Sequence, residues 1–221
     1  LKKQPDYGSI DFVKQVSTIL PYEWAKDSPE PKSNHVVVMD CGLKRNILRL
    51  LRARGCKVTV VPCAATASEI LDLNPDGILL SPGPGDPVLL DYAVNTVRGL
   101  VGKKPIMGIC LGNQLIARAF GAKTFKLKFG HRGGNHPVKE FATGRVHITA
   151  QNHGYAVDPD TMKNGLEVTH INLNDGTVEG LRHKELPIFA IQYHAEDSPG
   201  PMDNRYLFDR FLEMIGENSK L

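Results

Sequence analysis

The sequence predicts an α/β protein built on an open, mixed, mostly parallel sheet with helices on both faces. From His35 to Phe120, short apolar runs typical of buried strands alternate with segments of helical periodicity. Strand–helix units repeated in this way form parallel sheets that helices cover on both faces. With 221 residues, 41% of them hydrophobic, the chain is long enough for one sizeable domain of this class.

The expected elements follow one another closely up to residue 120. Strands are expected at residues 35–40, 57–61, 77–81 and 105–109, and helices at residues 43–54, from 66 onward, 86–101 and 112–120. Thr66 and Glu69 form a capping-box pattern at the start of the second helix. Asp86 and Pro87 suit the N-cap and the first position of the third.

After Gly121, shorter β-type stretches are expected at residues 124–129, 146–150, 167–172, 177–182 and 188–193, before a final helix over residues 203–215. The first 34 residues differ, because four prolines interrupt them and leave room for at most one short helix. We therefore interpret residues 1–34 as a leader or linker that follows a further N-terminal domain, and residues 35–221 as the folded domain.

Composition argues against several functional classes. The formal net charge of +3 is too small to indicate binding to nucleic acid or to an anionic membrane. No apolar run is long enough to span a bilayer and no signal-peptide pattern opens the chain, so we expect a cytoplasmic protein. The four cysteines form no CxxC pair and no zinc-like cluster, and scattered cysteines of this kind are more often small buried hydrophobes than bridges.

The segment Gly108-Ile109-Cys110-Leu111-Gly112 is the feature that most directly indicates chemistry. An apolar strand ends at Cys110, a helix begins at once, and glycines stand two residues before and two residues after. This is the pattern of a nucleophile elbow, in which a sharp turn projects the sulfur at a helix N-terminus whose dipole favours the thiolate. The N–H of Leu111 points to where an oxyanion would form. Taken alone, the pattern is equally compatible with a buried cysteine at a strand end.

A base and its orienting carboxylate are expected near the C-terminus, at His194 and Glu196. Residues two apart in an extended chain project to the same side, so the carboxylate can lie beside the imidazole. Such a pair supplies what a cysteine nucleophile needs for proton transfer. The alternative for an isolated pair is a solvated histidine and glutamate at a strand end.

A Gly/Pro loop at residues 81–87 (SPGPGDP) follows the third expected strand, at the sheet edge where ligands of open α/β sheets bind. No side chain shields its backbone N–H groups, so Gly83 could donate a second hydrogen bond to an oxyanion. The alternative is a turn that only leads into a helix. A phosphate loop is excluded, because no Gly-Lys-Ser/Thr sequence follows.

These three pieces together resemble the class I, triad-type glutamine amidotransferases over nearly the whole chain after residue 34. The elbow GICLGNQ, the loop SPGPGDP and the terminal YHAE carry the resemblance. Three further segments, at residues 129–138 (FGHRGGNHPV), 151–158 (QNHGYAVD) and 197–201 (DSPGP), are similar to the small, glutamine-hydrolysing subunit of carbamoyl-phosphate synthetases. The resemblance implies a flavodoxin-like fold and assigns residues 35–221 to a glutamine amidotransferase domain.

The resemblance also implies a role for each matching residue. Cys110 would attack the carboxamide carbon of L-glutamine, and the N–H groups of Leu111 and Gly83 would hold the oxyanion. His194, oriented by Glu196, would transfer the protons. The other substrate-binding residues are implied to be Gly85, Gln114, Asn152, Gly154 and Tyr155. Ammonia would pass to a large synthetase subunit that binds ATP, Mg²⁺ and bicarbonate, and no cofactor is expected in this chain.

Some features depart from the family's usual pattern. Ala195 stands where proline is frequent and leaves Glu196 less fixed. Asn113 stands beside the nucleophile where histidine is common, and Pro82 replaces a frequent asparagine. In the family, the small subunit has an N-terminal domain that contributes a serine to the glutamine site, so we expect weak glutaminase activity from this chain alone.

Two alternatives stay open at this point. One is an amidotransferase that serves another synthase, of the anthranilate or GMP type, and the other is a non-catalytic interaction subunit with the same fold. Three histidines, His131, His136 and His153, are interpreted as structural rather than metal-binding, because no ligand spacing recurs. Solvent or a subunit interface is expected for three basic residues, Lys126, Lys128 and Arg132.

Overall fold

The computed structural model describes residues 7–25 and 34–219 of the chain. Its strands are β1 (Tyr22–Glu23), β2 (His35–Asp40), β3 (Lys57–Pro62), β4 (Gly77–Leu80), β5 (Ile106–Ile109), β6 (Thr124–Glu140), β7 (Val146–Val157), β8 (Leu166–Asn172), β9 (Val178–His183) and β10 (Ile188–Ile191). Its α-helices are α1 (Val13–Val16), α2 (Arg45–Ala53), α3 (Ala67–Asp72), α4 (Asp91–Leu100), α5 (Leu111–Ala119) and α6 (Tyr206–Asn218). Short 3-10 turns, η1 (Tyr7–Ser9), η2 (Pro87–Leu89) and η3 (Pro159–Thr161), are also present.

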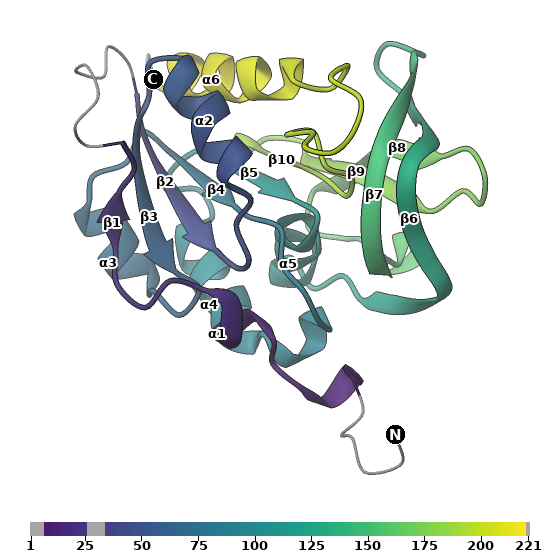
Figure 1. Cartoon of the computed structure of the whole chain (residues 1–221), viewed down its shortest axis with the longest axis horizontal. Helices are drawn as coiled ribbons and strands as arrows, with labels where there is room; N and C mark the ends of the chain where they lie inside the picture. The colour runs from purple at the N-terminus through teal and green to yellow at the C-terminus, as the bar shows by residue number, and fades with distance from the viewer. Residues whose placement is uncertain (1–6, 26–33, 220–221) are drawn as a thin grey trace.

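Within the described residues, the strands form one mixed sheet in the order β1-β3-β2-β4-β5-β10-β9-β8-β6-β7. Strands β3, β2, β4, β5 and β10 run parallel to one another, in the order of a flavodoxin-like sheet. Beyond β10, the antiparallel strands β9, β8, β6 and β7 extend the sheet, and Figure 1 shows this extension in green. The predicted open, mixed α/β sheet is confirmed.

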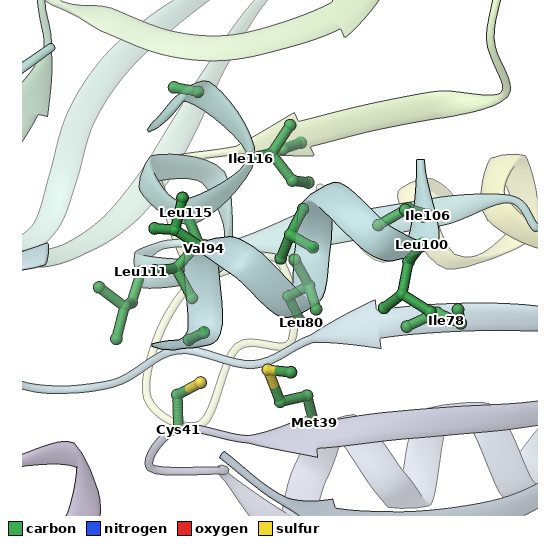
Figure 2. Close-up of a cluster of buried hydrophobic side chains, with 14 of the residues drawn as sticks. Met39, Cys41, Ile78, Leu80, Val94, Leu100, Ile106, Leu111, Leu115 and Ile116 are labelled. Atoms are coloured by element: carbon green, nitrogen blue, oxygen red, sulfur yellow. The ribbon is translucent and has the colours of Figure 1, made fainter. Parts of the chain in front are cut away.

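Helices cover both faces of the parallel strands because successive residues of a buried strand point to opposite faces. On one face, Met39 of β2 and Leu80 of β4 belong to a buried cluster with Val94 of α4 and Leu115 of α5, as Figure 2 shows. Each such buried side chain contributes about 1.5–3 kcal/mol to stability. The opposite face packs against α2 and α6 (Figure 1) through the buried residues Val36, Val38, Leu79, Ile47, Leu51, Phe208 and Phe211.

The parallel strands bring the predicted chemistry to one edge of the sheet. Cys110 directly follows β5, the loop at residues 81–87 directly follows β4, and His194 lies three residues beyond the end of β10. Because β4, β5 and β10 are parallel neighbours, their carboxyl ends meet at the same edge. The fold therefore accounts for a shared site built from segments that are distant in the sequence.

Several elements differ from the sequence-based expectations. Strand β7 continues to Val157 where an end at residue 150 was expected, and α6 begins at Tyr206 rather than at residue 203. Asp86 caps the short turn η2 by accepting a hydrogen bond from the Val88 N–H, and α4 begins only at Asp91. Strand β6 continues through a glycine-rich segment to Glu140, because β7 pairs with it despite two register irregularities. Strand β10 ends at Ile191 rather than at residue 193.

The described part of the N-terminal segment packs onto the domain. Val13 is fully buried, and β1 pairs antiparallel with the edge of β3. The Thr18 N–H donates to a carboxylate oxygen of Asp40 at 2.9 Å. The proposed boundary at residue 34 stays a prediction. Among the described residues, no helix combines the length and apolar character needed to cross a membrane.

Candidate active site

Cys110 occupies a strained turn between β5 and α5. Its backbone angles are φ 54° and ψ −102°, a region that residues other than glycine rarely adopt. The Cys110 N–H donates to the carbonyl oxygen of Ile191 at 2.8 Å, which ties the turn to the end of β10. Strain of this kind persists only where the surrounding structure enforces it, as a nucleophile elbow requires.

The two glycines of the elbow are required by close backbone contacts. A methyl group on Gly112 would lie 2.3 Å from the carbonyl oxygen of Leu80, and one on Gly108 would lie 2.7 Å from the backbone of Gly112. Both distances are far below van der Waals contact, and the neighbouring atoms belong to backbone that cannot move aside. The glycines therefore let α5 begin directly against β4 and β5, with Cys110 at its N-cap.

His194 and Glu196 form the pair that the sequence predicts. The Nδ1 atom of His194 lies 2.7 Å from Oε1 of Glu196, and the Glu196 side chain is fully buried. Against the effect of burial, interaction with the side chain of Cys110 raises the pKa of this imidazole. The strand geometry used to predict this pair is wrong in detail, because β10 has ended and both residues lie in the turn that follows. A hydrogen bond from the His194 N–H to the Ala150 carbonyl, at 2.9 Å, holds that turn.

The electrostatics of this pair favour a charged imidazole. Burial lowers the pKa of His194, but its hydrogen bonds to Cys110 and Glu196 outweigh burial and raise the pKa to about 10. Burial likewise raises the pKa of Glu196, and the hydrogen bond and charge of His194, with the charge of Lys44, reverse that effect and lower it. An imidazolium between a carboxylate and a sulfur is the arrangement that stabilises a thiolate.

Lys44 belongs to the site through its contact with Glu196, although no pattern in the sequence predicted this. Its Nζ atom lies 2.8 Å from Oε1 of Glu196 and donates to the carbonyl oxygen of Asp197 at 3.2 Å. Lys44 stands at the N-cap of α2, far before its partner in the sequence, and no local pattern marks it. It neutralises a buried carboxylate and holds it beside His194.

Replacing Lys44 by methionine is expected to lower the rate of the chemical step about tenfold and stability by about 1–2 kcal/mol. The loss is discounted from that of a fully buried ion pair because the Lys44 side chain is 31% exposed. Because Glu196 has a lowered pKa, its contribution to stability is present above its ordinary value of 4.5 and is lost as pH falls. The stability difference between variant and native chain, measured by urea unfolding, should therefore narrow below that pH.

A matched control is Lys57→Met, which removes a more exposed ion pair with Glu23, 3.6 Å long. That change should alter stability by less than about 0.5 kcal/mol. Equal effects of the two substitutions would contradict a special role for Lys44.

The loop at residues 81–87 packs against the elbow. A methyl group on Gly83 would lie 2.2 Å from the carbonyl oxygen of Cys41 and 2.6 Å from Cδ2 of Leu111, so only glycine fits. Gly85 adopts φ +93°, a conformation that favours glycine. The Ser81 hydroxyl accepts a hydrogen bond from the Cys41 N–H at 2.8 Å and fixes the start of the loop.

A cavity of about 350 Å³ opens in front of the sulfur. Eight of the ten predicted site residues line it: Gly83, Gly85, Cys110, Gln114, Asn152, Gly154, Tyr155 and His194. The other two, Leu111 and Glu196, lie behind this wall, where Leu111 has its side chain in the core and its N–H in the first turn of α5. The first N–H groups of a helix have no partner within the helix. The roles of these residues stay predictions, but the structure brings them to one place.

Further residues at the cavity were not predicted. Tyr7, Gly42, Lys44, Pro82, Pro84, Arg132 and His153 complete its lining. Arg132 is exposed, as expected, yet it lies at the cavity wall, where its Nη1 donates to the Phe129 carbonyl at 2.6 Å. Lys126 and Lys128 lie on β6, and both are exposed, as expected.

A cluster of His131, His153 and Glu179 places possible metal-ligand atoms within 4.8 Å of one another. Glu179 is fully buried and accepts hydrogen bonds from Gln151 and Asn172, both at 2.9 Å. A hydrogen bond to Glu179 raises the pKa of His131, whereas burial lowers that of His153 to about 4. Hydrogen bonds thus satisfy the carboxylate, and we interpret the cluster as a buried polar network rather than a metal site.

The chain resembles several proteins of known family. It is 57% identical over 206 residues to a carbamoyl phosphate synthase small chain of Staphylococcus epidermidis, covering 93% of this chain and 55% of that protein. It is 50% identical over 218 residues to the chloroplastic carbamoyl phosphate synthase small chain of Oryza sativa subsp. japonica, covering 95% of this chain and 49% of that protein. The chain thus spans about half the length of the curated relatives that it matches.

Solved structures agree with the fold. A putative GMP synthase protein from Thermoplasma acidophilum superposes with a TM-score of 0.74 at 25% identity, covering 84% of this chain and 96% of that one. A glutamine amidotransferase from Thermotoga maritima superposes with a TM-score of 0.59 at 16% identity, covering 83% and 85%, and supports the fold alone.

The sequence profile described as "Glutamine amidotransferase class-I" matches residues 37–214. This range contains β4 and β5, the elbow at Cys110, and both His194 and Glu196. Because the match extends over far more than half of the 221 residues, this chain belongs to the class I glutamine amidotransferase family.

Proposed function

We propose that this chain hydrolyses the side-chain amide of L-glutamine to glutamate and ammonia through a thioester on Cys110. The observation that carries the proposal is the convergence of a cysteine on a strained elbow, a buried His194–Glu196 pair and a glycine loop on one cavity. Each of the three segments had a structural alternative when considered alone. Their meeting at one cavity favours chemistry over those alternatives.

In the first half of the reaction, the Cys110 sulfur attacks the carboxamide carbon of glutamine. The oxygen of that carboxamide becomes an oxyanion, which the N–H groups of Leu111 and Gly83 stabilise from the elbow and the loop. The C–N bond then breaks, and His194 delivers its proton to the departing nitrogen, so that ammonia leaves and the γ-glutamyl thioester remains.

In the second half, His194 is neutral and takes a proton from a water molecule that attacks the thioester carbon. The C–S bond breaks, glutamate forms, and the sulfur leaves as a thiolate. The proton taken from water stays on the imidazole, which restores the starting pair of thiolate and imidazolium. Glu196 orients the imidazole through Nδ1 in both halves. The α-amino and α-carboxylate groups of glutamine are assigned to the wall formed by Gln114 and residues 152–155.

We further propose that the ammonia is passed to the large subunit of a carbamoyl-phosphate synthetase. The relatives that are 50% and 57% identical, with 95% and 93% of this chain covered, are named carbamoyl phosphate synthase small chain. ATP, Mg²⁺ and bicarbonate are assigned to that partner, and no cofactor is assigned to this chain. The cytoplasm stays the proposed location, although the relative from rice is named chloroplastic.

The rival partner is a synthase of another kind, because one structural neighbour is named a putative GMP synthase protein. Co-purification from the native organism separates the two. Capture of a carbamoyl-phosphate synthetase large subunit supports the proposal, whereas capture of a GMP or anthranilate synthase component contradicts it.

Labelling with the glutamine analogue diazo-oxo-norleucine tests the catalytic proposal. We expect a covalent adduct on Cys110 and none on Cys41, Cys56 or Cys63, which are buried away from the cavity, as measured by mass spectrometry of peptides. Excess glutamine should protect Cys110. If no adduct forms even when the large subunit is present, the chain is non-catalytic and the proposal fails.

A further inference from the structure

Gln192 places its amide beside the nucleophile. It directly follows β10, and its side chain is fully buried. Its Nε2 atom lies 3.6 Å from the sulfur of Cys110, within range of an N–H···S hydrogen bond. Its Oε1 atom accepts hydrogen bonds from Asn113 at 3.3 Å and from Gln114 at 3.0 Å. One side chain thus joins the nucleophile to two residues of α5.

The direction of this amide follows from its neighbours. Amide nitrogen and oxygen are assigned from the hydrogen-bond network, so each orientation needs an unambiguous partner. The backbone carbonyl of Tyr155 is such a partner, because it can only accept, and it lies 2.8 Å from Nε2 of Gln114. The second hydrogen on that nitrogen then points to Gln192, which must turn its oxygen toward Gln114. The nitrogen of Gln192 therefore faces the sulfur.

The backbone around Gln192 is held as firmly as the elbow itself. The Gln192 N–H donates to the Glu179 carbonyl of β9 at 2.8 Å, and the carbonyl of the preceding Ile191 accepts from the Cys110 N–H at 2.8 Å. Donor and sulfur are thus carried by backbone segments that are bonded to each other. A side chain supported in this way has a fixed position relative to its target.

We propose that Gln192 is a positioning residue for the nucleophile, donating a hydrogen bond that favours the thiolate of Cys110 and fixes the direction of its sulfur. A negatively charged sulfur accepts such a bond more strongly than a neutral thiol does. The same amide connects the sulfur to Gln114 on the substrate wall, so a substrate that engages Gln114 also steadies the nucleophile. The inference deepens the proposed function and rests on it for its biological role.

Gln192→Glu is the most selective test. A glutamate has the same shape and still accepts from Asn113 and Gln114, but it offers the sulfur a negatively charged oxygen in place of an N–H donor. We expect the rate of Cys110 alkylation by iodoacetamide at pH 7 to fall at least about tenfold. The pH at half-maximal alkylation should rise by about one unit. With glutamine as substrate, kcat should fall more than KM rises.

Two further variants separate positioning from stability. Gln192→Met removes the donor without adding charge, so it should shift the alkylation profile in the same direction by a smaller amount. Gln151→Met removes another buried amide, whose nitrogen donates to Glu179 rather than to the sulfur, and should leave the pH profile of alkylation unchanged.

A Gln192→Glu variant that folds and keeps the native pH profile of alkylation would overturn the inference. If that variant does not fold, a native pH profile of alkylation in Gln192→Met would overturn it instead. Folding is checked by circular dichroism and thermal unfolding. Alkylation needs no turnover of glutamine. The two proposals can therefore fail separately. If the pH profile of alkylation depends on Gln192 but diazo-oxo-norleucine does not label the chain, the proposed function is refuted and the positioning inference stands.

Discussion

His194→Asn is expected to slow glutamine hydrolysis at least about 10³-fold when assayed with the large subunit, because in the proposed mechanism His194 exchanges protons with both the sulfur and the leaving nitrogen. Asparagine keeps a polar side chain of similar size but cannot carry a proton between the two half-reactions. The measurement is release of glutamate and ammonia under saturating glutamine. A residual rate within about tenfold of the native chain would remove His194 from the mechanism.

His35→Asn is the matched control. His35 begins β2 at the amino end of the parallel strands, on the opposite edge from Cys110, and its ring contacts Thr59 at 2.8 Å. The rate of glutamine hydrolysis by His35→Asn should stay within about twofold of the native rate. A substitution this far from the cavity is expected to affect stability rather than the reaction.

The His194→Asn variant also tests whether the imidazole of His194 is charged. Although burial opposes it, hydrogen bonding to Cys110 and Glu196 raises the pKa of His194 from 6.5 to about 10. A raised pKa means that the stabilising contribution of the imidazolium is fully present below pH 6.5 and is lost as pH rises through about 10. The stability difference between the native chain and His194→Asn, from urea unfolding, should be constant between pH 4.5 and 6.5, shrink above 6.5 as the imidazole titrates, and shrink below 4.5 as Glu196 is protonated.

Gly112→Ala is expected to have the largest effect on the elbow itself. The added methyl group would lie 2.3 Å from the carbonyl oxygen and 2.8 Å from the Cβ of Leu80, in the middle of the parallel sheet. Relief requires α5 to move away from β4, at a stability loss of about 3 kcal/mol. Because α5 also carries the Leu111 N–H, a shift approaching about 1 Å should lower kcat about 10²-fold.

Gly216→Ala in α6 provides the contrasting control, because a methyl group there meets nothing within 4 Å. Removing a helical glycine without a clash should stabilise the chain by about 0.5–1 kcal/mol. Thermal unfolding of both variants compares the same substitution in a tight and in an open position. A Gly112→Ala chain as stable and active as the native one would show that α5 does not depend on the close approach.

The parallel half of the fold was predictable because its signals are local. The buried runs at residues 35–40 and 57–61 lie within one residue of the strands observed, and Thr66 with Glu69 forms the capping box that the sequence indicates. The antiparallel half was less predictable. Strand β6 extends far past the expected end because pairing with β7 carries it through glycines whose own preferences do not favour a strand.

Within the site, the residues to which we assign the proposed chemistry were visible in the sequence, and the residues that hold them were not. Cys110 with its glycines and His194 with Glu196 are recognisable because their spacing is short. Lys44 and Gln192 have no such pattern. Each acts on a residue that is distant in the sequence, through a single side-chain contact that exists only in the folded chain.

The sequence by itself determined the fold class, the elbow at Cys110 and the choice of His194 and Glu196 as a pair, because periodicity and short spacing mark them, although the geometry of that pair is set by the fold. Only the tertiary structure decided that the three segments share one cavity, that Lys44 balances the buried Glu196, and that Gln192 turns a nitrogen to the sulfur. The physical reason is that charge balance and hydrogen-bond direction depend on which side chains the sheet brings within about 3 Å of one another, and strand order sets those distances.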